Sequence, residues 1–401
     1  MTWIQRYMKG DRVIWIIALI ISVYSLLAVY STAGQLAFRY KGGNTEYYLI
    51  QRFFMLGLGI GLMFMAHRMR YTVFSKLSVI GLLVSIPLLL VTLVIGSNLN
   101  DASRWLTIPG VSISFQTSDL AKIVLLIYVA RTLAKKQEVI KDFKEGFLPV
   151  IIPVLLVCGL ILPANFSTAA LLFTNCLVLM FIGRCSLKHI GGLIGTAIVG
   201  FALLILLSYA FPKLLPRVDT WKARIENFLG LNEKTEVAAL PENAYVIDED
   251  QYQVEYAKMA IAEGRLVGTG PANNLNKYRL PQSYSDFIFA MIIGEYGFIF
   301  GGIIILLAYL ILIYRAIRIA QKSEFAFATF LALGLCFSLV LQALVNMCVA
   351  VNIFPVTGQP LPMVSMGGTS TLFTGLTLGI ILSVSRTLNK NDESATAESD
   401  H

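Results

Sequence analysis

The chain has 401 residues, of which 56% are hydrophobic and 14% are charged. Soluble domains carry roughly a quarter charged residues, so this composition excludes an ordinary soluble protein and indicates a polytopic membrane protein. The formal net charge of +8 would suggest nucleic acid only if the basic residues clustered on one face. They lie instead in short segments between apolar runs, where they act as topology signals, so we expect no nucleic-acid partner.

Successive apolar runs predict an all-α membrane protein with about ten transmembrane helices. The first run is too long for a signal-peptide core and lacks a convincing small-residue cleavage site, so we expect it to remain as a span. The runs lie near residues 13–33, 49–67, 74–96, 119–134, 147–163, 168–184, 188–210, 286–314, 325–352 and 367–386.

Lys and Arg accumulate after every second run, and this alternation predicts that both termini are cytoplasmic. Residues 1–388 then form a single integral membrane domain, with a large extracytoplasmic loop at about 211–285 between the seventh and eighth helices. The polar residues 389–401 predict a disordered cytoplasmic tail.

The large loop has two stretches with helical spacing. Val218, Trp221 and Ile225 recur among charged residues, which predicts a helix lying in the lipid headgroup region. Residues 253–263 predict a second helix. The glycine-rich residues 264–271 lack the Gly-Lys-Ser/Thr ending of a phosphate loop. A turn that presents bare backbone amides to a pyrophosphate stays open, as does simple headgroup anchoring by nearby basic residues.

Polar groups at the membrane boundary are functional candidates, because an unpaired charge is costly to bury. Gln116, Asp119 and Lys122 are three residues apart, so a helix would stack them on one face. The alternative is that Ser118 caps this helix and Asp119 interacts with its dipole. Candidates on the outer side are Arg52, Arg104, Gln116, Asp119, Lys122, Asn165 and Lys277.

Asp286 lies where the large loop enters the eighth apolar run. A carboxylate at this point is either a helix cap or a chemical group, and spacing alone favours the cap. On a helix, Glu295 would lie on the opposite face, about 13 Å away along the axis. Any acid–base chemistry would therefore rest on one carboxylate.

The last outer segment, residues 352–370, contains three prolines and three glycines and cannot form a regular helix. Irregular backbone at membrane depth persists only inside protein or around a water-filled cavity. We therefore expect a re-entrant loop that lines a cavity, with Ser365, Gly367 and Gly368 as candidate substrate contacts. Plain loop packing is the alternative.

Several of these motifs resemble the SEDS family of bacterial cell-wall proteins, which includes FtsW, RodA and SpoVE, and the resemblance covers nearly the whole chain. The first matching motif and the compact length are more similar to the division branch, FtsW. The matching segments are Ala102-Ser103-Arg104-Trp105, Gln116-Thr117-Ser118-Asp119 with Lys122, Leu280-Pro281 through Gly294-Glu295, and Pro355-Val356-Thr357-Gly358 through Leu361-Pro362 to Gly367-Gly368.

The resemblance implies a ten-helix peptidoglycan glycosyltransferase that polymerises lipid II outside the cytoplasmic membrane, at the division septum. It implies a class B penicillin-binding protein, other divisome membrane proteins and membrane lipids as partners. It implies no tightly bound cofactor; a loosely held divalent cation, Mg²⁺ or Mn²⁺, could assist. Asp286 matches the essential aspartate of the family, and the polar positions thought to line its cavity correspond to Arg52, Arg104, Gln116, Lys122 and Lys277.

Three positions depart from the family pattern. Asp119 stands where a glutamate is usual, Asn165 replaces an aspartate, and no histidine accompanies Asp286. A mechanism that needs a second carboxylate at Asn165 is therefore disfavoured. The working hypothesis is that Asp286 acts as general base and undecaprenyl pyrophosphate is released. The alternatives are a lipid II flippase, an elongation rather than a division role, or a scaffold.

Overall fold

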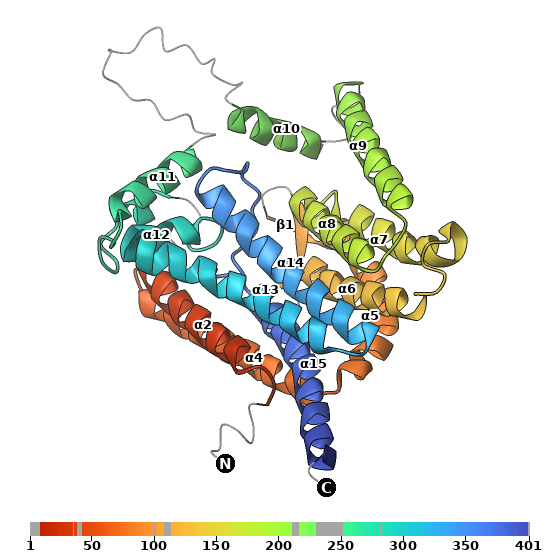
Figure 1. Ribbon diagram of the computed structural model, residues 1–401. Helices are drawn as coiled ribbons and strands as arrows, with labels where there is room; N and C mark the ends of the chain where they lie inside the picture. The colour runs from red at the N-terminus through yellow and green to blue at the C-terminus, as the bar shows by residue number, and fades with distance from the viewer. Residues whose placement is uncertain are drawn as a thin grey trace.

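The computed structural model describes residues 9–34, 36–37, 42–99, 102–107, 114–210, 216–229, 252–280 and 283–399. Each of the ten apolar runs forms helix, as predicted. The corresponding helices are α2 (Arg12–Thr32), α4 (Thr45–Arg68), α5 (Tyr71–Ile95), α6 (Thr117–Lys135), α7 (Leu148–Ile161), α8 (Phe166–Ile182), α9 (Leu187–Ala210), α12 with α13 (Ile288–Gly297 and Ile304–Lys322), α14 (Ala326–Ala350) and α15 (Ser370–Ser399). Figure 1 shows most of them packed as one bundle, with α9 at its periphery.

Eight helical segments in the described part of the chain are long and apolar enough to cross a membrane. The apolar helix α8 is shorter, and α6, which carries Asp119 and Lys122, is not among the eight. The chain is therefore a multi-pass membrane protein. The count of ten spans and the orientation of the termini stay predictions.

Shorter elements occupy the connections between these helices. The π-helical turn η1 (Phe143–Phe147) leads into α7. The strands β1 (Ser97–Leu99), β2 (Ala102–Thr107) and β3 (Ser114–Gln116) form a small antiparallel sheet that the hydropathy pattern does not predict. Within the large loop, α10 (Pro216–Phe228) and α11 (Tyr252–Gly264) confirm the two predicted helices, and the 3-10 turn η2 (Leu275–Tyr278) follows.

The eighth apolar run is interrupted rather than continuous. A π-helical segment, η3 (Phe298–Ile303), separates α12 from α13. Gly297 has φ +78° there, a backbone conformation that glycine adopts at little cost. A Cβ at Gly297 would overlap the backbone of Val267 and Gly268, so only glycine allows this close approach.

The tightest helix pair is α4 with α15. A Cβ added at Gly375 would overlap the carbonyl group of Gly59, and one at Gly379 would overlap the Met63 carbonyl oxygen. Gly375 and Gly379 are four residues apart, which is the small-residue spacing that lets membrane helices approach closely. The glycines thus determine how near α15 lies to α4.

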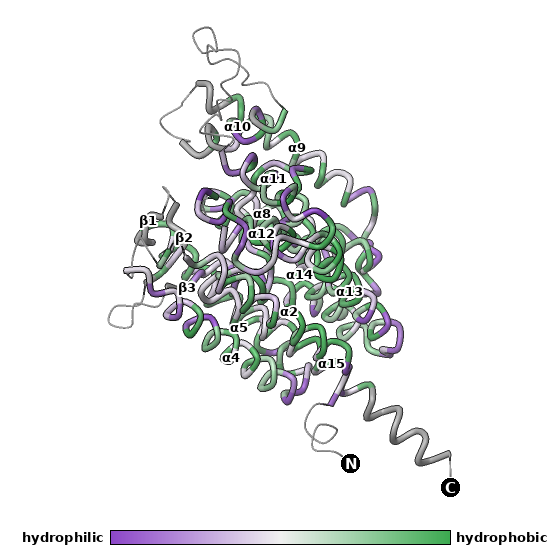
Figure 2. The backbone as a smooth tube through the Cα atoms, turned by 90° about the vertical axis from the view of Figure 1, so that its left-hand side faces the viewer, coloured by the Kyte–Doolittle hydropathy of each residue, from purple (hydrophilic) through white to green (hydrophobic). Residues whose placement is uncertain are grey.

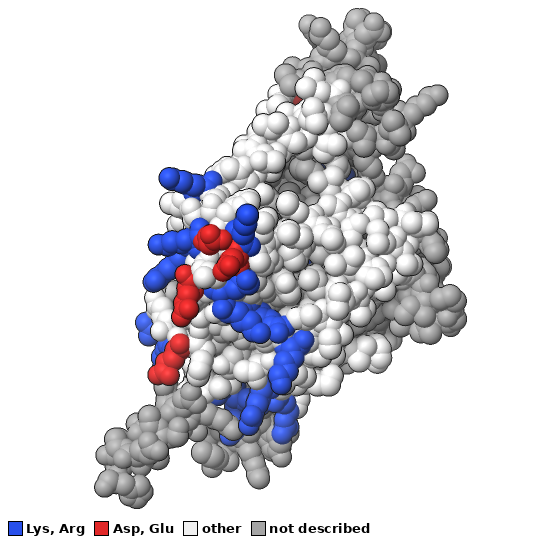
Figure 3. Space-filling model, turned by 90° about the vertical axis from the view of Figure 1, so that its right-hand side faces the viewer, with Lys and Arg blue, Asp and Glu red and all other residues white. Residues whose placement is uncertain are grey.

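At one end of the bundle, the beginning of α2 contacts α13, and α15 contacts the turn between α4 and α5. Asp11 caps α2 and pairs with Arg315 of α13 at 2.6 Å, while Ser383 of α15 donates to the Met69 carbonyl. Figure 2 shows an extensively apolar bundle, and α10 and α11 lie away from this end. On the face drawn in Figure 3, Lys and Arg gather along one side, a segregation typical of membrane proteins.

The C-terminal residues differ from expectation. The sequence predicts disorder from residue 389, whereas α15 continues as helix to Ser399. Residues 389–399 contain neither glycine nor proline, so no residue in this polar stretch interrupts the helix.

Candidate active site

Asp286 lies in the turn of residues 283–287, directly before α12. Phe287 occupies the N-cap position of α12 and makes no side-chain cap hydrogen bond. Asp286 therefore does not cap the helix, although the spacing in the sequence favours that role. The carboxylate is half-buried, and the Ser285 hydroxyl donates to its Oδ1 at 2.9 Å. The turn therefore presents Asp286 as a hydrogen-bonded carboxylate at the edge of the bundle.

The segment between α14 and α15 covers this turn. It has no helix between Ala350 and Ser370, which confirms the prediction of irregular backbone. Its Ser365 hydroxyl donates to the Ser285 carbonyl at 2.6 Å, and the Met366 amide donates to the Tyr284 carbonyl at 2.9 Å. We call residues 351–369 the re-entrant loop, because Gln359 and Ser365 within it are buried by protein.

Two amide side chains of α14 hold the re-entrant loop. Asn346 Nδ2 donates to the carbonyl oxygens of Asp286 at 2.8 Å and Gln359 at 2.7 Å. One turn earlier, Gln342 Nε2 donates to the Pro360 carbonyl at 2.8 Å. Neither residue is predicted from the sequence. The available signal was a pair of amides four residues apart in an apolar helix, since polar groups at that depth are commonly functional.

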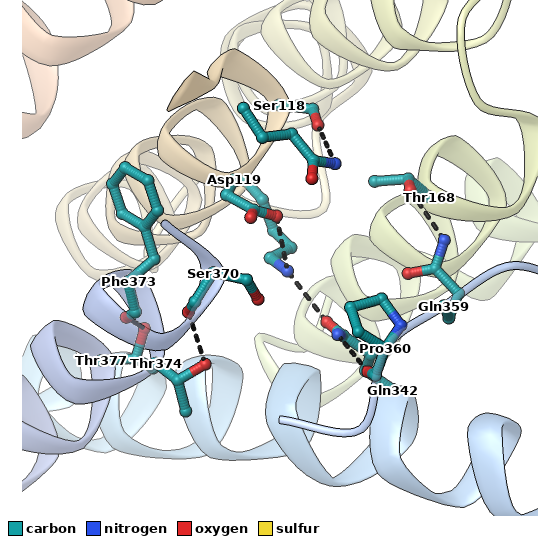
Figure 4. A network of polar contacts seen from close by, with 12 residues as sticks. Ser118, Asp119, Thr168, Gln342, Gln359, Pro360, Ser370, Phe373, Thr374 and Thr377 are labelled. Atoms are coloured by element: carbon teal, nitrogen blue, oxygen red, sulfur yellow. Dashed lines mark hydrogen bonds and ion pairs between the residues drawn. The ribbon is translucent and has the colours of Figure 1, made fainter. Parts of the chain in front are cut away.

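Lys122 of α6 reaches the same point. Its Nζ donates to Gln342 Oε1 at 2.9 Å and lies 3.5 Å from Asp119 Oδ1, which confirms that Asp119 and Lys122 share a face. Figure 4 shows this network, with Gln342 bonded to Pro360 and the Gln359 side chain pointing toward Thr168. Asp119 Oδ2 is buried with no hydrogen-bond partner among the described residues.

Gln116 departs from the predicted stacking. It occupies the N-cap position of α6 without capping the helix through its side chain, and its Nε2 donates to Ser118 Oγ at 3.0 Å. Ser118 is therefore not the N-cap. The Gln116 backbone amide donates to Thr369 Oγ1 of the re-entrant loop at 3.4 Å, so Gln116 still borders the network.

Asn165 is the N-cap of α8, where its Oδ1 accepts from the Thr168 amide at 3.2 Å. Thr168 Oγ1 in turn accepts from Gln359 Nε2 at 2.8 Å. A cavity between α5, α6 and α7 is lined by Asn165 together with Thr92, Thr117, Ser118 and apolar side chains. Asn165 thus shapes the edge of the site, and an amide is well suited to the capping role it performs.

Arg52 does not face a substrate cavity. It is buried within the bundle, 2% exposed, where Nε donates to Ser25 at 2.7 Å and Nη1 to Thr371 at 2.8 Å. Its Nη2 donates to the carbonyl oxygens of Met363 and Val364. The guanidinium therefore fastens the re-entrant loop to α2, α4 and α15, in place of the predicted substrate contact.

We expect Arg52→Lys to lower the free energy of unfolding by about 2–4 kcal/mol, because lysine cannot reproduce a fork of bonds to four partners. The measurement is thermal unfolding of the purified protein in detergent. Arg68→Lys, at an exposed position of the same helix, serves as control and should change little. Equal stability of the two variants would contradict the structural role of Arg52.

Lys277 and the glycine-rich turn at residues 264–271 also make their contacts within the protein. Lys277 is buried, its Nζ donates to the Ala272 carbonyl at 2.5 Å, and it lies 5.0 Å from the centre of the Tyr278 ring. The amides of Gly268, Thr269 and Gly270 donate to backbone carbonyls of residues 264, 294 and 295. They are therefore not bare, and the interpretation of this turn as a pyrophosphate cradle is wrong.

The remaining predicted site residues have different settings. Arg104 belongs to β2, but its side chain lies outside the described residues. Ser365 is buried, with its hydroxyl bonded to backbone groups of residues 285 and 361. The Gly367 amide donates to the Ser365 carbonyl, and Gly368 is exposed. Gly368 is therefore the most exposed of the three loop residues Ser365, Gly367 and Gly368.

Within the described residues, no group of three or more His, Cys, Asp or Glu side chains could hold a metal ion. Asp286, Asp119 and Lys122 instead belong to one hydrogen-bonded system that runs through Gln342, Asn346 and the loop residues Gln359 and Pro360. A loosely bound divalent cation stays a prediction. Asp286 enters this system through its backbone carbonyl, while its carboxylate accepts from Ser285.

Comparison with known proteins identifies the family. A family model described as "Cell cycle protein" (FTSW_RODA_SPOVE) matches residues 11–390. The chain belongs to the FtsW/RodA/SpoVE family. This assignment confirms the resemblance derived from the motifs, across nearly the whole chain.

Relatives within the FtsW/RodA/SpoVE family align over most of their length. The chain is 31% identical over 385 residues to the probable peptidoglycan glycosyltransferase FtsW of Geobacter metallireducens, covering 95% of each protein. It is 28% identical over 382 residues to stage V sporulation protein E of Bacillus subtilis, covering 94% of this chain and 97% of that protein.

Solved structures share the fold. A chain of a peptidoglycan synthase complex aligns with a TM-score of 0.69 at 24% identity, covering 94% of this chain and 98% of that one. The rod shape determining protein RodA of Thermus thermophilus aligns with a TM-score of 0.66 at 22% identity, covering 95% of this chain and 98% of that one. These likenesses establish the FtsW/RodA/SpoVE architecture for this chain.

Proposed function

We propose that this protein is a peptidoglycan glycosyltransferase of the bacterial cytoplasmic membrane, which polymerises lipid II at the outer face during cell division. The observation that carries the proposal is the setting of Asp286. Its half-buried side chain lies under the re-entrant loop at Gly358. Its backbone carbonyl accepts from Asn346 of α14, one turn after Gln342, which accepts from Lys122. Relatives across the full chain are named peptidoglycan glycosyltransferases, and their FtsW name supports the division role.

In the proposed reaction Asp286 is the general base. Its carboxylate takes the proton from the 4-hydroxyl of the acceptor lipid II sugar, and that oxygen bonds to the anomeric carbon of the growing chain. The bond from this carbon to undecaprenyl pyrophosphate breaks with inversion, and the pyrophosphate carries away the electron pair. A base must lie within hydrogen-bond reach of the proton it removes, and the Ser285 bond restrains Asp286 in the required orientation.

The leaving pyrophosphate gains negative charge, so a cation in the site would stabilise the transition state. Lys122 is the described residue best placed for this role, because it is mostly buried and held by Asp119 and Gln342. Arg104 and a divalent cation such as Mg²⁺ or Mn²⁺ are further candidates. Arg52 and Lys277 are used for internal contacts and are not assigned this role.

The proposed partner is a class B penicillin-binding protein that crosslinks the glycan strands, alongside other divisome membrane proteins. The fold match to a chain of a peptidoglycan synthase complex supports such an assembly. The proposed location is the septal cytoplasmic membrane.

The deciding experiment incubates the purified protein with lipid II, with and without the class B penicillin-binding protein. We expect glycan strands that separate by length on a gel. The competing function, a lipid II flippase, predicts translocation of a labelled headgroup across liposomes without polymer. Translocation with no polymer under both conditions would refute the glycosyltransferase.

A further inference from the structure

Asn346 joins two segments that are far apart in the sequence. Its Nδ2 donates to the carbonyl oxygens of Asp286 and Gln359, at 2.8 and 2.7 Å. An amide nitrogen carries two hydrogens, so both are used. The side chain thereby ties the turn before α12 to the re-entrant loop, from the buried interior of α14.

The second of these bonds lies next to a point where the loop comes close to the carboxylate. A Cβ added at Gly358, the residue before Gln359, would lie 3.5 Å from Asp286 Oδ2. Gly358 has φ +66°, a conformation in which other side chains are strained. The same amide therefore holds both the backbone that carries the carboxylate and the backbone that covers it.

We infer that Asn346 is a positioning residue for the proposed glycosyl transfer, which sets the distance and direction of the Asp286 carboxylate relative to the re-entrant loop. This inference rests on the proposed role of Asp286. Asn346 acts through the Asp286 backbone and not on the substrate. A displacement of about 1 Å at a reacting group can reduce the rate on the order of 100-fold. We therefore expect the two hydrogen bonds of Asn346 to affect kcat more than KM.

Asn175 of α8 provides a matched control. Its Nδ2 donates to the Gly334 carbonyl of the same helix α14, at 3.0 Å. Asn175 and Asn346 are both 1% exposed. The Oδ1 atoms of both have no hydrogen-bond partner among the residues that the structure describes. Asn346 makes two such bonds, to the Asp286 turn and the re-entrant loop, whereas Asn175 makes one, to α14.

The test compares full-length Asn346→Ala and Asn175→Ala with the unmodified protein. Thermal unfolding in detergent measures the stability loss, and steady-state polymerisation of lipid II gives kcat and KM. Both variants should lose stability. We expect kcat of Asn346→Ala to fall about 100-fold with little change in KM. Asn175→Ala, assayed at a temperature where it is folded, should keep kcat within about threefold, because it removes no contact made in the transition state.

Equal kcat for the two variants would overturn the inference, and so would a rise in KM at unchanged kcat, which indicates a substrate-binding role. If Asn346→Ala is not recovered folded, Asn346→Leu replaces it, because leucine keeps the branching and the number of side-chain heavy atoms but has no hydrogen-bond donor. A normal kcat for that variant counts equally against positioning. Absence of polymer with the unmodified protein would instead reject the proposed function itself.

Discussion

Replacing Asp286 with asparagine should abolish the polymerisation of lipid II while leaving a folded membrane protein. Asparagine keeps the size of the side chain and can still accept the bond that Ser285 donates, but it cannot take up a proton from the acceptor hydroxyl. Loss of a general base typically costs about 10²- to 10⁴-fold in rate. The measurement is gel analysis of glycan strands made by the purified variant with its partner.

Glu295→Gln is the matched control for this experiment. Glu295 is also a buried carboxylate near the beginning of the eighth apolar run, where it accepts a hydrogen bond from Ser31 of α2. It has no place in the proposed chemistry, so its variant should polymerise lipid II even if it is less stable. Polymer synthesis by Asp286→Asn at the level of Glu295→Gln would remove Asp286 as the base.

Gly375→Ala should destabilise the bundle by at least about 2 kcal/mol, because an added methyl group overpacks a tight interface. The methyl group would overlap the Gly59 carbonyl and force α15 away from α4. Thermal unfolding in detergent measures this loss. Since Thr371, one turn earlier on α15, accepts from Arg52, the displacement should also loosen the re-entrant loop and reduce polymerisation.

Gly61→Ala supplies the control for this prediction. Gly61 lies on α4, two residues from Gly59, and an added Cβ there would meet nothing within 4 Å. Alanine is favoured over glycine in a helix by about 1 kcal/mol, so this variant should be as stable as the unmodified protein or more so. Destabilisation of similar size in both variants would indicate that close helix packing is not the cause.

Several features of the site were accessible from the sequence. Irregular backbone between α14 and α15 follows from the proline and glycine content of that segment. The shared face of Asp119 and Lys122 follows from helical spacing. The motif resemblance singled out Asp286 against the local spacing, which favours a cap. In the structure Phe287 takes the N-cap position, so Asp286 does not cap α12, and its catalytic role stays a proposal.

Other assignments failed for identifiable reasons. Proximity to the membrane boundary made Arg52 a substrate-binding candidate, but that criterion cannot distinguish a side chain facing a cavity from one facing a neighbouring helix. The glycines of the turn after α11 suggested a phosphate cradle. They serve instead to let backbone pack on backbone, since a Cβ at Gly264 or Gly268 would overlap carbonyl groups of α12.

By itself the sequence determined the membrane helices. An apolar run of about 20 residues in lipid has few options other than helix, because every backbone group must be satisfied internally. Only the tertiary structure decided the partners of the polar side chains. Asn346 meets Asp286 across 60 residues of chain and Arg52 meets Met363 across 311. Such bonds depend on how helices pack and rotate, which no local pattern encodes.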